Sequence, residues 1–170
     1  AQVLVETARF WVSRYSPAPE PGKVNLLFCK GPDEYCGITS NNLFTNAMVK
    51  HNLSLALAAA ARLKQEAPEQ YAALGLSETE CSAWEILRDA IQLPRDPVTG
   101  RYRQDDTFHL LERIDPAKLK SGDEASYHQV CFDRLQRYQV IKQADTLLLM
   151  TRLPEQFTEE EKLAAWEDFE

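Results

Sequence analysis

The chain has 170 residues, of which 44% are hydrophobic and 26% are charged, a composition typical of one soluble globular domain. Its formal net charge is −7 and no basic stretch is concentrated along it, which argues against nucleic-acid binding. The longest apolar runs, residues 53–61 and 146–150, are far shorter than the ~20 residues that a membrane-spanning helix needs. The first residues, AQVLVETARFW, also lack the pattern of a signal peptide.

Cysteine and histidine spacing gives no sign of a metal site. The four cysteines are irregularly spaced without a CxxC pair, and the three histidines lie far apart. We therefore expect no metal ligands and predict reduced thiols in a cytoplasmic protein. The residues concerned are Cys29, Cys36, Cys81, Cys131, His51, His109 and His128.

The first half of the chain predicts two helices joined by a turn-rich stretch. Residues 3–14 place apolar side chains on one helical face and end before Pro17, and residues 24–29 form a short strand or an extended segment. A long helix follows at residues 42–64, and we expect asparagines near its start to cap and orient it rather than to contact substrate. The expected face of the first helix is Leu4, Ala8, Trp11 and Val12; that of the long helix is Phe44, Met48, Leu55, Ala59 and Leu63; the asparagines are Asn41, Asn42 and Asn46.

The second half predicts shorter helices separated by long connections. Ser77 and Glu80 have the spacing of a capping box for a helix that ends near residue 91, and Thr158 and Glu161 have the same spacing before the last helix. Further helices are expected at residues 125–134 and 140–153, with turns at 93–100 and an extended segment at 101–112. The chain is thus predicted to be all-α, with long loops that carry function. Both ends fall within predicted helices, so we expect a piece of a longer protein.

The segment GPDEY, residues 31–35, is the first candidate for chemistry. Asp33 and Glu34 are adjacent carboxylates in a loop closed by Tyr35. Mutual repulsion and burial beside the aromatic ring would raise the pKa of the less solvated one, and a carboxyl that stays protonated can donate to a leaving oxygen. An exposed acidic turn is the alternative that composition alone favours.

A second candidate is the pair Lys142 and Gln143, with Asp145 close behind, at the expected start of a helix. Lysine and glutamine side chains at a helix end are suited to holding sugar hydroxyls. An ordinary solvated helix turn is the alternative interpretation, and spacing alone leaves the function open.

Taken together, ordered segments across nearly the whole chain resemble one family, the glycoside hydrolase family 65 phosphorylases, whose members act on maltose, trehalose, kojibiose or nigerose. No single segment is specific for this family, but an ordered set of segments that includes GPDEY and VIKQAD is specific for it. The segments are ETARFW at residues 6–11, GPDEY at 31–35, NNLFTNAM at 41–48, RQDDTFHL at 103–110 and RYQVIKQADTLLLM at 137–150, followed by LPEQFTEEEK.

The resemblance implies that residues 1–170 are a single partial domain, roughly half of an (α/α)6 barrel catalytic domain. It implies inverting phosphorolysis of an α-linked glucose disaccharide to β-glucose 1-phosphate, with Glu34 as general acid and with Asp33 and Tyr35 supporting it. Lys142 and Gln143 would hold the non-reducing glucose. Inorganic phosphate would be a co-substrate and no cofactor would be needed. The expected partners are an α-glucoside, the rest of the same catalytic domain and further copies of the full-length protein, without nucleic acid or membrane.

Some features of the family are not carried by this chain. Its phosphate-binding His and Ser residues would follow the C-terminal end, and its Trp-Asp substrate motif would precede the first residue. Cys36 stands where many members carry His, which affects the expected acceptor sugar rather than proton donation by Glu34. Two alternatives stay open: an α-glucoside hydrolase of the same family, which needs a second carboxylate about 6.5–9.5 Å from the acid, and an inactive helical interaction module.

Overall fold

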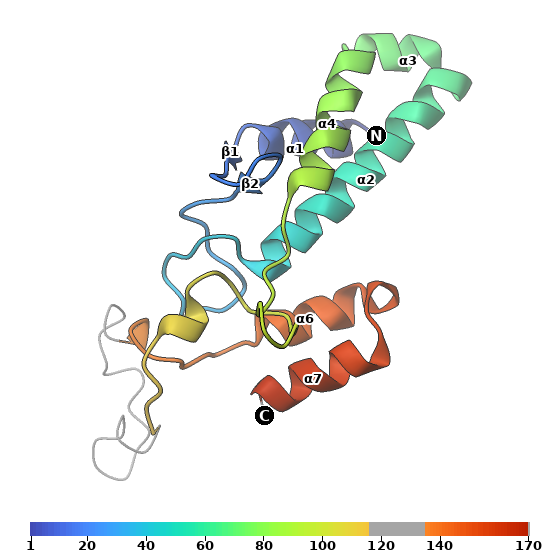
Figure 1. Cartoon of the computed structure of the whole chain (residues 1–170). Coiled ribbons are helices and arrows are strands. Elements are labelled where there is room, and N and C mark those ends of the chain that lie inside the picture. The colour runs from blue at the N-terminus through green and yellow to red at the C-terminus, as the bar shows by residue number, and fades with distance from the viewer. Residues whose placement is uncertain (116–134, 170) are drawn as a thin grey trace. The chain divides into compact units, whose positions relative to one another are not determined.

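The computed structural model describes residues 1–115 and 135–169, and it confirms the prediction of a mainly helical chain (Figure 1). The expected helix at residues 125–134 lies outside the described residues. The described chain forms two compact units, Ala1–Leu27 with Asn46–Gln92, and Phe28–Thr45 with Leu93–Glu170. The elements are α1 (Gln2–Val12), β1 (Ser16–Pro17), β2 (Val24–Asn25), α2 (Leu43–Glu66), α3 (Pro68–Ala73), α4 (Glu78–Ala90), the 3-10 helix η1 (Phe108–Leu110), α6 (Asp145–Arg152), the 3-10 helix η4 (Pro154–Gln156) and α7 (Glu159–Phe169).

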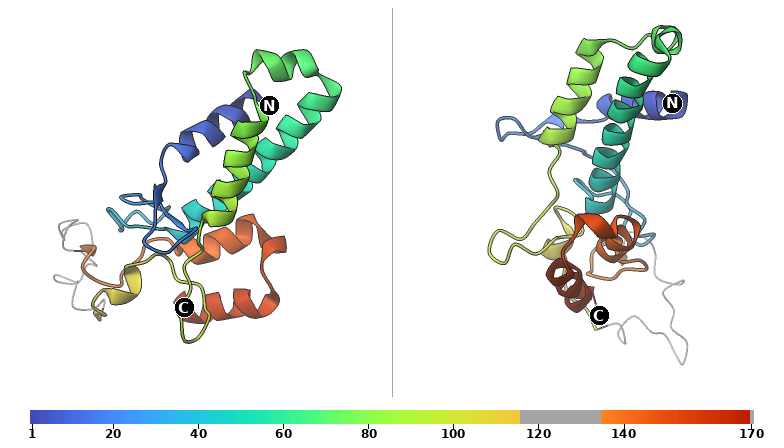
Figure 2. Two further views of the ribbon diagram at one scale, coloured as in Figure 1. Left: turned by 45° about the horizontal axis from the view of Figure 1, so that its top comes forward. Right: turned by 90° about the vertical axis from the view of Figure 1, so that its right-hand side faces the viewer.

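In the first unit, α1 and α4 lie beside α2, and the short α3 joins α2 to α4 (Figures 1 and 2). Their facing apolar side chains form the core, in which Trp84 is only 1% exposed. A small antiparallel hairpin, β1 and β2, pairs Ser16 with Asn25, and β2 also bridges to Ile91 at the end of α4. The core consists of Val5, Ala8, Val49, Leu53, Ala56, Ala60, Leu63, Leu76, Trp84, Leu87 and Ile91.

The bounds of the long helix α2 are close to the prediction, but the expected buried face is largely wrong. Of its predicted members only Leu63 is buried, and Leu55 is 43% exposed. Apolar residues surround the middle of α2, so periodicity did not identify the face that packs against α1 and α4. That face is Val49, Leu53, Ala56, Ala60 and Leu63. In α1 the buried residues are Val5 and Ala8, so Ala8 alone of the expected face is buried.

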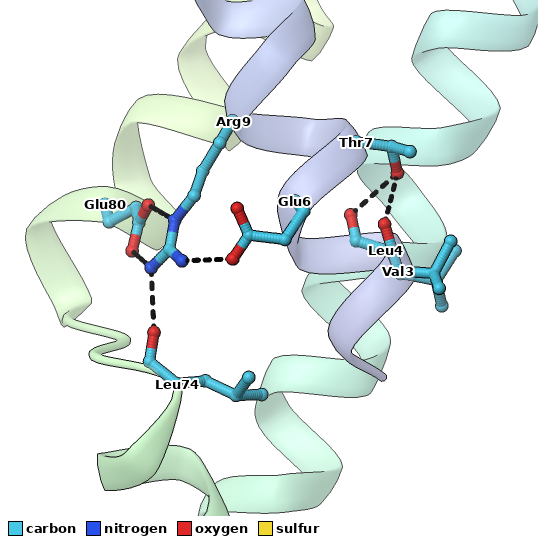
Figure 3. Close-up of polar contacts among 7 residues, drawn as sticks. All are labelled: Val3, Leu4, Glu6, Thr7, Arg9, Leu74 and Glu80. Atoms are coloured by element: carbon cyan, nitrogen blue, oxygen red, sulfur yellow. Dashed lines mark hydrogen bonds and ion pairs between the residues drawn. The ribbon is translucent and has the colours of Figure 1, made fainter.

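An ion pair joins α1 to the start of α4 (Figure 3). Arg9 donates from Nε to Glu80 Oε1 at 2.7 Å and from Nη2 to Glu80 Oε2 at 3.0 Å, and Nη2 also reaches the carbonyl of Leu74. Ser77 caps α4 by accepting from the Glu80 amide at 3.2 Å. The Glu80 carboxylate binds Arg9 rather than returning a hydrogen bond to Ser77, so only half of the predicted capping box forms.

In the second unit, α6 and α7 pack side by side, with η4 in the turn between them (Figure 1). The capping box before α7 is complete, because Glu161 accepts from the Thr158 amide at 3.1 Å and Thr158 accepts from the Glu161 amide at 3.2 Å. Helix α6 begins at Asp145 rather than at residue 140. Residues 140–144 are therefore a non-helical approach to α6, and Lys142 and Gln143 lie on it.

Within residues 1–115 and 135–169, none of the helices has the length and apolar character required to cross a bilayer.

Candidate active site

The GPDEY loop is held at its base by a short antiparallel bridge, in which the backbone groups of Cys29 and Thr39 exchange hydrogen bonds of 2.8 and 2.9 Å. Within the loop, Asp33 is 1% exposed while Glu34 points outward. Asp33 Oδ1 accepts from the amide of Tyr35 at 3.1 Å and from the amide of Lys142 at 2.9 Å. The first of the two adjacent carboxylates therefore fixes the loop, and the second is presented by it.

A buried polar frame supports the loop from the start of α6. Asp145 accepts from the Asp33 amide at 2.8 Å and from Asn42 Nδ2 at 2.7 Å. Gln104 Nε2 donates to Asp33 Oδ2 at 3.4 Å, and its Oε1 accepts from the Asp145 amide at 3.2 Å. All four side chains, Asp33, Asn42, Gln104 and Asp145, are at most 2% exposed. We call these four residues the polar frame.

Burial shapes the electrostatics of this frame. It raises the pKa of Asp145 to about 6, with the nearby charge of Asp33 adding to the rise and the hydrogen bond from Asn42 opposing it. Asn42 also caps α2, as expected, because its Oδ1 accepts from the backbone amide and the hydroxyl of Thr45, both at 3.0 Å. The frame thus ties the start of α2, the GPDEY loop and the start of α6 together.

The three residues expected to act on substrate lie together. Lys142 Nζ donates to Glu34 Oε2 at 2.6 Å, and Gln143 Nε2 donates to Glu34 Oε1 at 3.0 Å. Gln143 Oε1 in turn accepts from the Glu34 amide at 3.1 Å. The side chains of Glu34 and Lys142 are 58% and 47% exposed, so solvent reaches this cluster.

The expectation of a raised Glu34 pKa is wrong for this structure. The hydrogen bond from the Lys142 ammonium group, followed by that from Gln143, lowers the pKa of the Glu34 carboxyl below its ordinary value. The expectation assumed that Glu34 is buried and close to the Asp33 charge. Instead Glu34 is exposed, and the Asp33 carboxylate turns inward to the backbone of residues 35 and 142. Glu34 is therefore ionised at neutral pH in the absence of ligand.

A cavity of about 580 Å³ is lined by Asp33 and Tyr35, the two residues that flank Glu34 in the sequence, whereas Glu34 is not among its lining residues. Phe108 and Tyr138 give it aromatic walls, and Cys36 also lines it. Burial, with the charges of Asp105 and Asp33, raises the pKa of the Cys36 thiol to about 11, so this thiol is neutral. The lining residues are Asp33, Tyr35, Cys36, Gly37, Ile38, Asp105, Thr107, Phe108, Leu111, Gln136, Tyr138 and Val140.

Sequence reasoning did not single out Gln104 or assign a role to Asp145. Both are polar residues in segments that look solvated by composition, RYRQDD and IKQAD. The structure shows how tightly this loop packs at Gly31, where a Cβ atom would overlap the side chains of Asp145 and Asn42. A glycine that must lie directly against side chains from distant segments indicates a tightly packed loop.

A loop carboxylate held against a lysine and a glutamine, beside a cavity with aromatic walls, is an arrangement suited to acid-assisted chemistry on a sugar. The class that the comparisons define is the glycosyl hydrolases. The chain belongs to glycosyl hydrolase family 65, because the sequence model of that family's central catalytic domain matches residues 1–170.

Named relatives are enzymes several times longer than this chain. The chain is 35% identical to an alpha,alpha-trehalose phosphorylase of Thermoanaerobacter brockii over 165 residues, covering 94% of this chain and 21% of the relative. It is 30% identical to a kojibiose phosphorylase of Caldanaerobacter subterraneus subsp. tengcongensis over 179 residues, covering 100% and 23%. The chain therefore spans about a fifth of the length of these relatives.

A solved structure shares the fold. The structure described as "Putative kojibiose phosphorylase from human microbiome" matches with a TM-score of 0.86 and 23% sequence identity, over 99% of this chain and 23% of that one. The arrangement of helices and loops seen here is thus that of one part of a larger known protein.

Proposed function

We propose that the protein containing this chain catalyses inverting phosphorolysis of an α-linked glucose disaccharide or glucoside, with Glu34 as the general acid. The observation that carries the proposal is the meeting of Glu34 with Lys142 and Gln143, which lie 108 and 109 residues further along the chain. The matches to phosphorylases acting on trehalose and kojibiose support the choice of substrate class.

In the proposed reaction, a phosphate oxygen attacks the anomeric carbon of the glucose ring on the face opposite the leaving group. The bond from that carbon to the glycosidic oxygen breaks, and the proton of Glu34 passes to that oxygen. The products are β-glucose 1-phosphate and the released sugar. Phosphate is already an anionic nucleophile, so one protein carboxyl is sufficient, whereas an inverting hydrolase needs a second one to activate water.

The ion pair between Lys142 and Glu34 describes the ligand-free state in this mechanism. A bound glucose ring offers hydroxyl groups to Lys142 and Gln143, and each hydrogen bond formed there competes with one made to Glu34. Loss of these partners removes the two leading causes of the lowered Glu34 pKa. A phosphate anion close by would raise the pKa further, since like charge disfavours ionisation. Substrate binding would then favour the protonated form of the acid that the reaction uses.

The cavity lined by Cys36 and Tyr138 is the proposed place of the acceptor sugar, because both sequence neighbours of Glu34 line it and it offers aromatic rings to a sugar face. We further propose that the chain supplies roughly half of an (α/α)6 barrel, completed by the rest of the same catalytic domain. A cytoplasmic location, a homo-oligomeric full-length protein and a reaction without cofactor belong to the same proposal.

The test is an assay of the full-length protein on trehalose, kojibiose, nigerose and maltose, with and without inorganic phosphate. Release of glucose 1-phosphate that requires phosphate, with β configuration by NMR, is the expected result. Release of free glucose alone, at a rate independent of phosphate, would assign the protein to the hydrolases. No turnover of any of these sugars would contradict both.

A further inference from the structure

Asp145 accepts hydrogen bonds at both of its carboxylate oxygens, from two segments distant in sequence. Its Oδ1 accepts from the Asp33 amide at 2.8 Å, and its Oδ2 accepts from Asn42 Nδ2 at 2.7 Å. The residue is 1% exposed and stands in the first turn of α6, where a negative charge is favoured by the helix dipole. Its side-chain hydrogen bonds go to Asp33 and Asn42 rather than to Glu34, Lys142 or Gln143, so its proposed effect on these three is indirect.

The link between the two segments is reciprocal. The Asp145 carboxylate accepts from the backbone of Asp33, and the Asp33 carboxylate accepts from the backbone of Lys142 at 2.9 Å. Each segment therefore supplies a buried acceptor for a backbone N–H group of the other. Two such bonds in opposite directions fix the relative position of the two segments, because hydrogen bonds constrain direction as well as distance.

Close packing supports the same relationship independently. A Cβ atom at Gly31 would overlap Asp145 Oδ2 and the Asn42 amide, so the loop backbone lies directly on the hydrogen bond between these two side chains. Glu34, in contrast, has a side chain that is 58% exposed and is held by hydrogen bonds from Lys142 and Gln143. Its position relative to Lys142 therefore depends on how the loop is seated on Asp145.

We propose that Asp145 is a positioning residue that holds Glu34 in register with Lys142 and Gln143. It does so by accepting simultaneously from Asp33 and Asn42. The inference rests on the proposed role of Glu34 where it concerns activity, but its geometric part stands without that role.

The variant Asp145→Asn tests the need for two acceptors. An amide has one acceptor oxygen and one donor group, so in either orientation it places a donor against the Asp33 amide or against Asn42 Nδ2. We expect the loop to shift and kcat of the full-length enzyme to fall about 10²-fold, the loss typical of a misplacement near 1 Å. The matched control is Asp89→Asn, which changes an exposed carboxylate on α4.

An exchange variant separates positioning from general damage. Asn42→Asp combined with Asp145→Asn reverses the donor and acceptor of this pair while leaving an acceptor for the Asp33 amide. It also removes the longer hydrogen bond of 3.4 Å from Asn42 Nδ2 to the Gln104 carbonyl, so the recovery is expected to be partial. An aspartate at position 42 can still cap α2, since Asp and Asn are comparable caps. We expect kcat of the exchange variant to be at least about tenfold higher than kcat of Asp145→Asn. A merely structural role would instead lower the melting temperature of Asp145→Asn while leaving kcat per folded molecule unchanged.

Crystal structures of the wild-type protein and both variants give a readout that needs no activity. The contact between Glu34 Oε2 and Lys142 Nζ should be lost in Asp145→Asn and present in the exchange variant. An intact contact in Asp145→Asn, a wild-type kcat for that variant, or an exchange variant no better than the single one would each overturn the inference. If Asp145→Asn does not fold, the exchange variant tests the inference by itself. A folded exchange variant that lacks the contact between Glu34 and Lys142 would overturn the positioning role of Asp145. An inactive wild-type enzyme would sink the proposed function alone, because the structural comparison would still decide the role of Asp145.

Discussion

The side-chain amide of Gln143 binds Glu34 at two points, since its Oε1 accepts from the Glu34 amide at 3.1 Å and its Nε2 donates to Glu34 Oε1 at 3.0 Å. One residue thereby holds both the backbone and the carboxylate of the candidate acid. In the proposed mechanism the same Nε2 group turns to a sugar hydroxyl when substrate binds. Gln143 is thus placed to orient the acid before the reaction and the sugar during it.

The variant Gln143→Ala should therefore lower kcat/KM of the full-length enzyme. Each neutral hydrogen bond lost to substrate costs about 0.5–1.5 kcal/mol, which corresponds to a decrease of roughly two- to tenfold. The melting temperature should change little, because the side chain is only partly buried. Gln70→Ala on α3 is the matched control, with an exposed glutamine. Wild-type kinetics for Gln143→Ala would support the alternative interpretation, in which Gln143 lies in an ordinary solvated turn and does not bind substrate.

The variant Glu34→Gln keeps the shape of the acid but removes its transferable proton. General acid catalysis typically contributes about 10²–10⁴-fold, so kcat on a disaccharide should fall by that factor while substrate still binds. The loss should be much smaller on α-glucosyl fluoride, which has the anomeric configuration of the proposed disaccharide, because fluoride leaves without protonation. Glu159→Gln, an exposed carboxylate at the start of α7, is the control. An equal loss on the fluoride and on the disaccharide would argue against proton donation by Glu34.

The lowered pKa of Glu34 predicts a specific pH dependence. The acid must be protonated to react, so kcat/KM, which reports the free enzyme, should fall as pH rises above the Glu34 pKa. The Lys142 hydrogen bond is the leading cause of the lowering. Lys142→Gln should therefore raise this pKa and move the alkaline limb of the kcat/KM profile to higher pH, even if the rate itself is reduced.

Lys162→Gln is the control for the pH experiment, because Lys162 pairs with Glu159 on α7 and does not contact Glu34. Its profile should overlay that of the wild-type enzyme. A limb that stays in place in Lys142→Gln, or moves to lower pH, would show that the ion pair does not set the acidity of the catalytic group.

The ion pair between Arg9 and Glu80 should contribute to stability more than an exposed pair does. Arg9 makes a two-pronged contact with Glu80 and a further hydrogen bond to the Leu74 carbonyl, and its side chain is 31% exposed. Arg9→Ala should reduce the free energy of unfolding by about 1–2 kcal/mol, a hydrogen-bond value discounted for solvent screening. Arg62→Ala, which breaks an exposed pair with Glu66, should cost at most about 0.5 kcal/mol. Equal losses in thermal or denaturant unfolding would contradict this ranking.

The sequence predicted the helices well where local signals mark their ends. Ser77 before α4 and Thr158 before α7 cap these helices as their spacing indicated. The predicted start of α6 was wrong. The apolar run at residues 146–150 favours a helix that begins earlier, whereas the backbone at residues 142 and 143 instead donates to Asp33 of the GPDEY loop and is not helical. The buried face of α2 was also missed, since that choice depends on which partner helices pack against it.

The candidate site could be predicted only in part, because it also depends on contacts between segments distant in the sequence. Glu34, Lys142 and Gln143 were named from motifs, and the structure brings them together. Burial was expected to raise the pKa of Glu34, but this pKa is lowered in the structure. Which of two adjacent carboxylates turns inward depends on hydrogen-bond donors more than one hundred residues away, such as the Lys142 amide. Gln104 and Asp145 gave no local signal, because a buried polar residue looks in sequence like an exposed one.

The polar frame also separates the residues that hold Glu34 beside Lys142 from the residues that form the wall of the cavity. The stretch between Gln104 and Lys142 is anchored at both of its ends by hydrogen bonds to Asp33. That stretch supplies Phe108, Leu111 and Tyr138 to the cavity wall. Substitutions of these wall residues can therefore change the cavity while the contact between Glu34 and Lys142 is preserved. Under the proposed function, new acceptor preferences would then arise from substitutions at these wall positions, with Glu34 left in place.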